Sequence, residues 1–133
     1  MKITNNFSLE EFTYSRTAIE HALNNVPGYR ETVALKSLVV NLLQPLRDCL
    51  NAPIAITSGY RSPDVNLLVG GVPSSQHTKG EAADCYTAEG PEHLLSVLLA
   101  SGLAFDQAIV YRRKCFLHLS FREGFNRGRV LYK

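Results

Sequence analysis

A histidine and an aspartate, His77 and Asp84, lie seven positions apart in a run of small and polar residues that extends from Thr57 to Tyr86. Imidazole nitrogen and carboxylate oxygen are both common zinc donors, and a hydrolytic zinc site takes three protein ligands and keeps a fourth position open. A second histidine, His118, stands in the short context L-H-L-S. Two histidines and one carboxylate would fit that description, and the same residue types also bind other divalent ions.

Each of these residues also has a simpler interpretation. His77 alone is typical of a polar loop, and His118 could be a histidine at the edge of the core, bonded to a carbonyl. Asp84 could cap a turn, but its neighbours Ala83 and Cys85 indicate a buried strand, where an unpaired carboxylate is costly. A bound cation would remove that cost.

Three short motifs follow one another in this stretch: SGYRSPxxN, GG and SxHxxGxAxD. Their residues here are Ser58, Gly59, Tyr60, Arg61, Ser62, Pro63, Asn66, Gly70, Gly71, Ser75, His77, Gly80, Ala82 and Asp84. In this order they resemble the zinc D-Ala-D-Ala carboxypeptidase and endopeptidase family, peptidase family M15, and within it subfamily A. The resemblance implies a zinc-dependent peptidase that hydrolyses peptidoglycan peptide bonds between D-amino acids, in the manner of a single-domain phage endolysin. It also implies that His77, Asp84 and His118 bind one Zn²⁺ ion, since the L-H-L-S context of His118 resembles the family's closing motif.

The same resemblance implies that Arg61 contacts the substrate. A guanidinium group can bind a carboxylate through two hydrogen bonds or stabilise an oxyanion. A structural salt bridge is the alternative for this arginine. Ser75 and Gln76 resemble polar residues on the substrate side of the family's site, and Tyr111 could donate a hydrogen bond to an oxyanion.

A zinc peptidase also needs a general base that accepts a proton from the attacking water. The resemblance places this acid a few residues before the last histidine, but residues 110–117 contain no carboxylate. Asp106 is the nearest upstream acid, and it shares a face with His118 if the intervening hairpin has a three-residue turn. A two-residue turn presents Tyr111 and Gln107 instead. The other acids considered are Glu81 and Glu123, each with an exposed loop position as its alternative.

The missing acid leaves two rival functions open. In the first, the protein keeps zinc and the cleft but binds wall peptides without cutting them. In the second, zinc only stabilises the fold, as part of a phage particle or another assembly. The presence of Arg61 and of three ligands with an open fourth position favours the enzyme.

The elements that position these residues follow from the hydrophobic pattern. The sequence S-x-x-E at residues 8–11 predicts a helix start, and helical sequence continues to about residue 24. Residues 30–50 carry apolar side chains at three- and four-residue intervals, which predicts the main core helix, kinked or divided at Pro45. Residues 54–58 alternate as a short strand, and residues 91–101 form a second amphipathic helix. The Thr57–Tyr86 stretch is expected to be mostly loop.

Two strand-like runs, residues 105–111 and 115–121, flank three basic residues and predict a β-hairpin. Leu117 and Leu119 share one face of the second run, so His118 lies on the other. The tail after Gly124 predicts a last edge strand. The expected fold is α+β, with N-terminal helices packed on a small antiparallel sheet that carries the zinc site, and the resemblance implies a hedgehog- and DD-peptidase-like architecture.

The length of 133 residues fits one domain, residues 1–133, that buries a core without disulfides. The net charge of +2 does not single out nucleic acid or a membrane as a partner. Seven basic residues in the last 22 positions are a solvated edge or, alternatively, a contact for an anionic wall polymer. Three cysteines without a CxxC pair are expected to be buried apolar groups: Cys49, Cys85 and Cys115.

The expected partner is the stem peptide of peptidoglycan, and the protein is expected to act as a monomer. Its first residues lack the apolar core of a signal peptide, and no apolar run approaches the roughly 20 residues of a membrane span. We therefore expect synthesis in the cytoplasm, with phage-mediated delivery to the cell wall.

Overall fold

The strongest apolar pattern in the chain folds as one long helical segment in the computed structural model, which describes residues 1–133. It consists of α3 (Tyr29–Leu38), a π-helical turn η1 (Val39–Leu43) and α4 (Gln44–Leu50). In the π-turn the Gln44 N–H bonds to the Val39 carbonyl. Pro45 lies at the start of α4 and has no N–H of its own. The wider turn just before it therefore lets the helix continue past the proline, which agrees with the predicted division.

The sheet has five strands in the order β1-β2-β4-β3-β5. The strands are β1 (Ala55–Ser58), β2 (Ala82–Tyr86), β3 (Gln107–Tyr111), β4 (Phe116–Ser120) and β5 (Arg129–Tyr132).

The expectation of a purely antiparallel sheet is wrong, because β5 pairs in parallel with β3. The physical reason lies in the short return after β4. Residues 121–128 bring the chain back at the end where β4 finishes and β3 begins, so that Arg129 pairs with Gln107. One edge of β4 is already paired with β2, and β5 therefore runs along the free edge of β3 in the same direction. The predicted edge strand in the tail is confirmed as β5.

The β3–β4 hairpin closes through a four-residue turn, since Tyr111 pairs with Phe116. Turns of two and of four residues both pair odd-numbered residues of β3 with even-numbered residues of β4, so they bring the same residues to the face of His118. Gln107 and Tyr111 therefore share the face of His118, and Ile109 is its direct partner. Leu117 and Leu119 are fully buried on the other face, as predicted.

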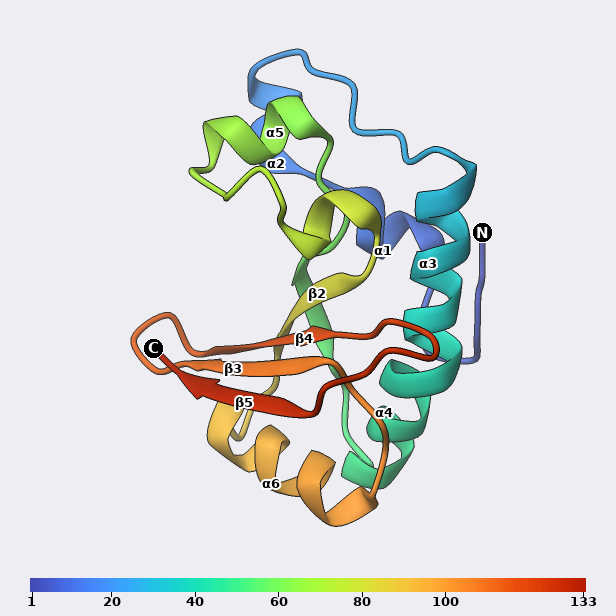
Figure 1. The fold of residues 1–133 in the computed structure, drawn as a ribbon, viewed down its shortest axis with the longest axis vertical. Helices are drawn as coiled ribbons and strands as arrows, with labels where there is room; N and C mark the ends of the chain where they lie inside the picture. Colours follow the sequence, from blue (N-terminus) through green and yellow to red (C-terminus); the bar gives the residue numbers. More distant parts are fainter.

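The core lies between that apolar face and the helices. Figure 1 shows α3 and α4 beside the sheet, α6 (Pro91–Ser101) at one end of the molecule, and α2 (Arg16–Glu20) with α5 (Pro63–Leu68) at the other. Residues from α3, η1, α4, α6 and the inner faces of the strands form one buried cluster. None of the helices has the length and apolar character needed to span a membrane. The likeness to the hedgehog and DD-peptidase fold stays a prediction.

The Thr57–Tyr86 stretch is more regular than expected. It contains the end of β1, helix α5, the 3₁₀ turn η2 (Gln76–Lys79) and β2. The start of α5 has a plain local cause, because Ser62 caps the helix by accepting a hydrogen bond from the Val65 N–H, and Pro63 occupies the first turn.

The helices at the N-terminus are shorter than predicted: α1 covers Leu9–Thr13 and α2 ends at Glu20.

Asn25 ties the N-terminal segment to this stretch. Its side-chain amide donates to the carbonyl oxygens of Thr13 and Tyr60, and its Oδ1 accepts from the Ser62 N–H at 2.7 Å.

The prediction of three buried cysteines is correct only for Cys85; Cys49 and Cys115 are exposed. Cys49 lies on the outer side of α4 and Cys115 in the hairpin turn, so neither faces the core.

Candidate metal centre

The three predicted ligands converge from three elements. His77 is buried in η2, Asp84 lies on β2, and His118 lies on the neighbouring strand β4 as the direct partner of Asp84. Directly paired residues on antiparallel strands point to the same face of a sheet. One potential ligand atom from each residue lies within 4.8 Å of the other two. The fold therefore brings together residues that are as many as 41 positions apart in the chain.

The orientation of His77 is set by the backbone of Gly59. The His77 Nδ1 atom lies 2.7 Å from the Gly59 carbonyl oxygen, and a carbonyl can only accept, so Nδ1 carries the hydrogen and donates it. Glycine is required there, because an added Cβ would lie 2.5 Å from the Phe12 carbonyl oxygen. The result is that Nε2 of His77 presents its lone pair to the site, as expected of a metal-ligating histidine.

That lone pair faces a carboxylate, which makes the three side chains suited to a cation. Nε2 of His77 lies 3.3 Å from Oδ1 of Asp84, and Nδ1 of His118 lies 2.9 Å from the same oxygen. A neutral imidazole lone pair and a carboxylate oxygen repel each other unless a proton or a metal ion lies between them. Two imidazoles and one carboxylate also match the donor set of hydrolytic zinc sites. The residues present therefore fit a zinc ion.

The protonation state of Asp84 is also favourable for metal binding. Burial raises the pKa of this carboxyl, but its interactions with the His118 and His77 side chains outweigh the effect of burial and hold its pKa well below the usual range. Asp84 is thus ionised near neutral pH, and an ionised carboxylate is the form that binds metal.

Arg61 lies against the same carboxylate. Its Nη2 is 3.6 Å from Oδ2 of Asp84, while Nε donates to the Ser58 hydroxyl and Nη1 to the Asn66 side-chain oxygen. Burial lowers the pKa of Arg61, and the charge of Asp84 and the phenol of Tyr111 offset part of that effect. The guanidinium is therefore fixed beside the metal ligands.

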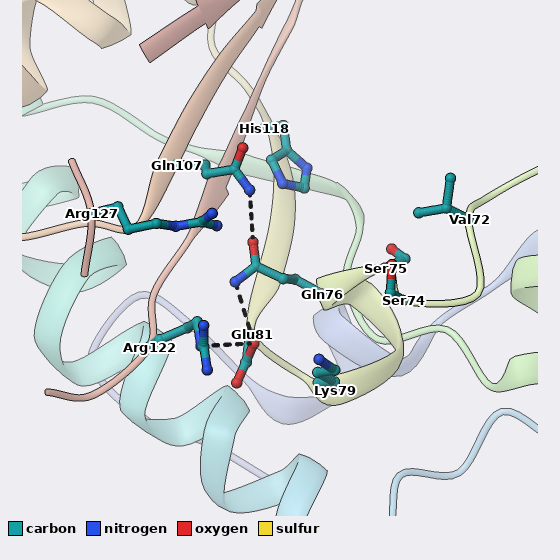
Figure 2. A pocket seen from close by; sticks show the side chains of 10 residues that line it. All are labelled: Val72, Ser74, Ser75, Gln76, Lys79, Glu81, Gln107, His118, Arg122 and Arg127. Atoms are coloured by element: carbon teal, nitrogen blue, oxygen red, sulfur yellow. Dashed lines mark hydrogen bonds and ion pairs between the residues drawn. The ribbon is translucent and has the colours of Figure 1, made fainter. Parts of the chain in front are cut away.

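A polar cavity of about 370 Å³ opens next to His118 (Figure 2). Ten residues line it, and only Val72 is apolar. The predicted substrate-side residues Ser75 and Gln76 are both in this lining. Gln76 lies at its centre, where its Nε2 donates to Glu81 and its Oε1 accepts from Gln107. The cavity is a place where a polar ligand can approach the three-residue cluster.

Asp106, the acid suggested as general base, is fully buried and is held by other groups. Arg127 donates to it through Nε and Nη2, each at 2.9 Å, and through its backbone N–H, while Gln76 donates from Nε2. The hydrogen bonds from Arg127 are the main cause of a pKa lowered to about 2. A carboxylate with four donors and so low a pKa is a weak proton acceptor, and it lies outside the three-residue metal cluster.

The remaining predicted residues divide between the site and the surface. Tyr111 is on the site face, stacked on Phe116 with ring centroids 4.6 Å apart. Glu81 lines the cavity, whereas Glu123 is exposed and bonds to the Ser37 hydroxyl.

Four site residues received no role from the sequence: Asn66, Lys79, Arg122 and Arg127. Asn66 belongs to the SGYRSPxxN motif, and that membership was the available signal. Lys79 lies in the same 3₁₀ turn as His77, and its side chain carried no separate signal. Arg122 and Arg127 were noted only as part of the C-terminal basic cluster, because their place at the cavity depends on the connection between β4 and β5.

Comparison with known proteins places this geometry in context. The model of a family described as peptidase M15 matches residues 5–120 of the chain. No curated protein matches the chain. The matched range includes all three candidate ligands, Arg61 and the first four strands of the sheet, β1 to β4.

Proposed function

The chain belongs to the peptidase M15 family, and from this premise we propose that it is a zinc-dependent peptidase that cleaves peptidoglycan stem peptides at a bond between D-amino acids. The observation that carries the proposal is the convergence of His77, Asp84 and His118 within 4.8 Å beside an open polar cavity. Zinc bound by these three residues would supply Lewis-acid polarisation of a peptide carbonyl and a lowered pKa for water.

The chain's own groups have separable roles in this proposal. Asp84 and the two histidines hold the metal, and the Gly59 carbonyl keeps His77 in the correct tautomer. Arg61, held by Ser58 and Asn66, is placed to bind a substrate carboxylate or a developing oxyanion. Tyr111 is a second hydrogen-bond donor on the same face.

Glu81 replaces Asp106 as our candidate for the proton acceptor. It is the only carboxylate that lines the cavity beside His118, and its contacts are loose: Gln76 donates to it at 3.3 Å and Arg122 lies 3.9 Å away. We expect Glu81→Gln to lower kcat by about a hundredfold or more, the size of a general-base contribution. The matched control is Glu123→Gln, which neutralises an exposed acid outside the cavity, and it should leave kcat unchanged.

The direct test is to incubate the zinc-loaded protein with purified peptidoglycan and to measure newly released amino and carboxyl ends. Release is expected with the wild-type protein and should be lost in His77→Ala. No release by a protein with verified zinc content would contradict the peptidase.

One observation favours a second candidate, a zinc-containing domain that binds wall peptides without cutting them. The β3–β4 hairpin carries no acid on the site face, and the nearest buried acid, Asp106, is already bound by Arg127. If the protein is retained on peptidoglycan but releases no new ends, and Glu81→Gln changes nothing, the binding domain is the better description.

A further inference from the structure

The cavity beside His118 has an excess of positive charge. Its lining contains three basic residues, Lys79, Arg122 and Arg127, and one acidic residue, Glu81. With a single apolar residue in the lining, the cavity is poorly suited to a hydrophobic side chain. Its composition instead favours an anionic group that enters next to the metal-binding face.

The basic groups differ in how far they are already paired. Lys79 is exposed and forms no ion pair within the chain, and Arg122, 44% exposed, lies 3.9 Å from Glu81 in a long ion pair. Arg127 uses Nε and Nη2 to bind Asp106. Two cations therefore stand against one partly buried acid, Glu81, and the charge available to a ligand comes from Lys79 and Arg122.

Of these two cations, Arg122 lies on the other side of the metal-binding residues from Arg61. Arg61 is bonded to Ser58 at the end of the outer strand β1, and the next strands inward carry Asp84 and then His118. The cavity continues in that direction with Gln107 on β3 and Arg122 after β4. A peptide laid across the face would therefore meet one positive group on each side of the metal ligands.

We propose that Lys79 and Arg122 form a specificity subsite for a second carboxylate of the substrate, separate from the group held by Arg61. The preferred ligand is an acidic peptide whose free side carboxylate enters the cavity while the scissile bond lies at the metal ligands. The inference rests on the proposed function for the identity of the peptide, but the charge preference of the cavity can be measured without turnover.

The test uses two synthetic stem peptides that end in D-Ala-D-Ala and differ in one group: the glutamyl residue carries either a free carboxylate or a carboxamide. For the zinc-loaded wild type we expect kcat/KM to be about fivefold higher with the carboxylate peptide, the effect of a half-exposed ion pair. In the double variant Lys79→Gln/Arg122→Gln this ratio should fall to about one. The ratio cancels any general effect of the two substitutions on folding or on metal content, because both peptides are cleaved by the same protein.

The matched control is Arg113→Gln/Lys114→Gln, which removes the same charge from the exposed hairpin turn and should keep the wild-type ratio. If neither peptide is cleaved, the proposed function fails, and the dissociation constants of the same peptides, measured by calorimetry at low salt, decide the subsite. Equal affinity of the wild type for both peptides, or an unchanged preference in the double variant, overturns the proposal.

Discussion

Two buried aspartates in this protein, Asp84 and Asp106, have opposite surroundings. Asp84, with a side chain 9% exposed, faces two imidazole nitrogens and a guanidinium group at 3.6 Å. Asp106, fully buried, accepts two hydrogen bonds from the Arg127 side chain at 2.9 Å and one each from the Arg127 backbone and Gln76. Asp84 is left with a place for a cation, whereas Asp106 already has its cation in Arg127.

The difference shows why burial of an acid does not identify a catalytic group. A buried carboxylate is stable when a cation or several hydrogen-bond donors compensate it. Arg127 completes that compensation at Asp106 and makes it a structural group. At Asp84 the partners include a histidine whose lone pair faces it, so the compensation is incomplete until a cation is bound.

The largest effect expected from this comparison concerns metal affinity. Asp84→Asn removes the anionic ligand, and we expect zinc affinity to fall by more than about a hundredfold, beyond what the loss of an outer partner costs. Competition with a chelator measures this change. Asp106→Asn is the matched variant and should leave zinc affinity within about threefold of wild type, since Asp106 is not a ligand. Equal losses in the two variants would contradict the division between the aspartates.

The stability of the metal-free protein should show the reverse order of effect at the two aspartates. Arg127→Met removes the cation from buried Asp106 and leaves that carboxylate without its charge partner, so it should clearly lower the free energy of unfolding. Asp84→Asn should change it by only about 1 kcal/mol, because an amide can donate to the His77 lone pair. Urea denaturation in the presence of chelator measures both values, and a larger loss in Asp84→Asn would reverse our interpretation.

The acid dependence of stability should also trace to Asp106. Its pKa is lowered from 3.8 to about 2 in the folded protein. A lowered carboxyl pKa stabilises the folded state above the unfolded pKa, near pH 4, and that contribution is lost as the pH falls towards 2. The difference in unfolding free energy between wild type and Asp106→Asn should therefore shrink between pH 5 and pH 2, as measured by denaturation at each pH. A difference that stays the same from pH 5 to pH 2 would show that protonation of Asp106 does not control this part of the stability.

The smallest effect is expected from helix α5, which holds Arg61 in place through Asn66. Ser62→Ala removes the cap of α5, the helix that carries Asn66, and should cost about 1 kcal/mol of stability. Because Asn66 holds Arg61, KM should rise modestly while zinc affinity stays at the wild-type value. Ser96→Ala, which removes a local hydroxyl hydrogen bond on the exposed face of α6, is the control and should leave KM unchanged.

Much of the fold and of the site could be predicted because it depends on short patterns. The main helix, the hairpin, the final strand and the outward face of His118 follow from the spacing of apolar residues, and the division at Pro45 follows from its missing N–H. Helix α5 was missed although Ser62 and Pro63 carry a local start signal. The exposed positions of Cys49 and Cys115 were missed because residue type alone does not fix burial.

The sequence by itself determined the family resemblance, the chemistry of the three candidate ligands and the absence of an acid before His118. Only the tertiary structure decided that β5 runs parallel to β3 and that the hairpin turn has four residues. It also decided that Arg127 forms an ion pair with Asp106, so that Glu81 is the acid in the cavity. The physical reason is that donor type is a property of one residue, whereas the partner of a buried charge is chosen by packing between segments far apart in the chain.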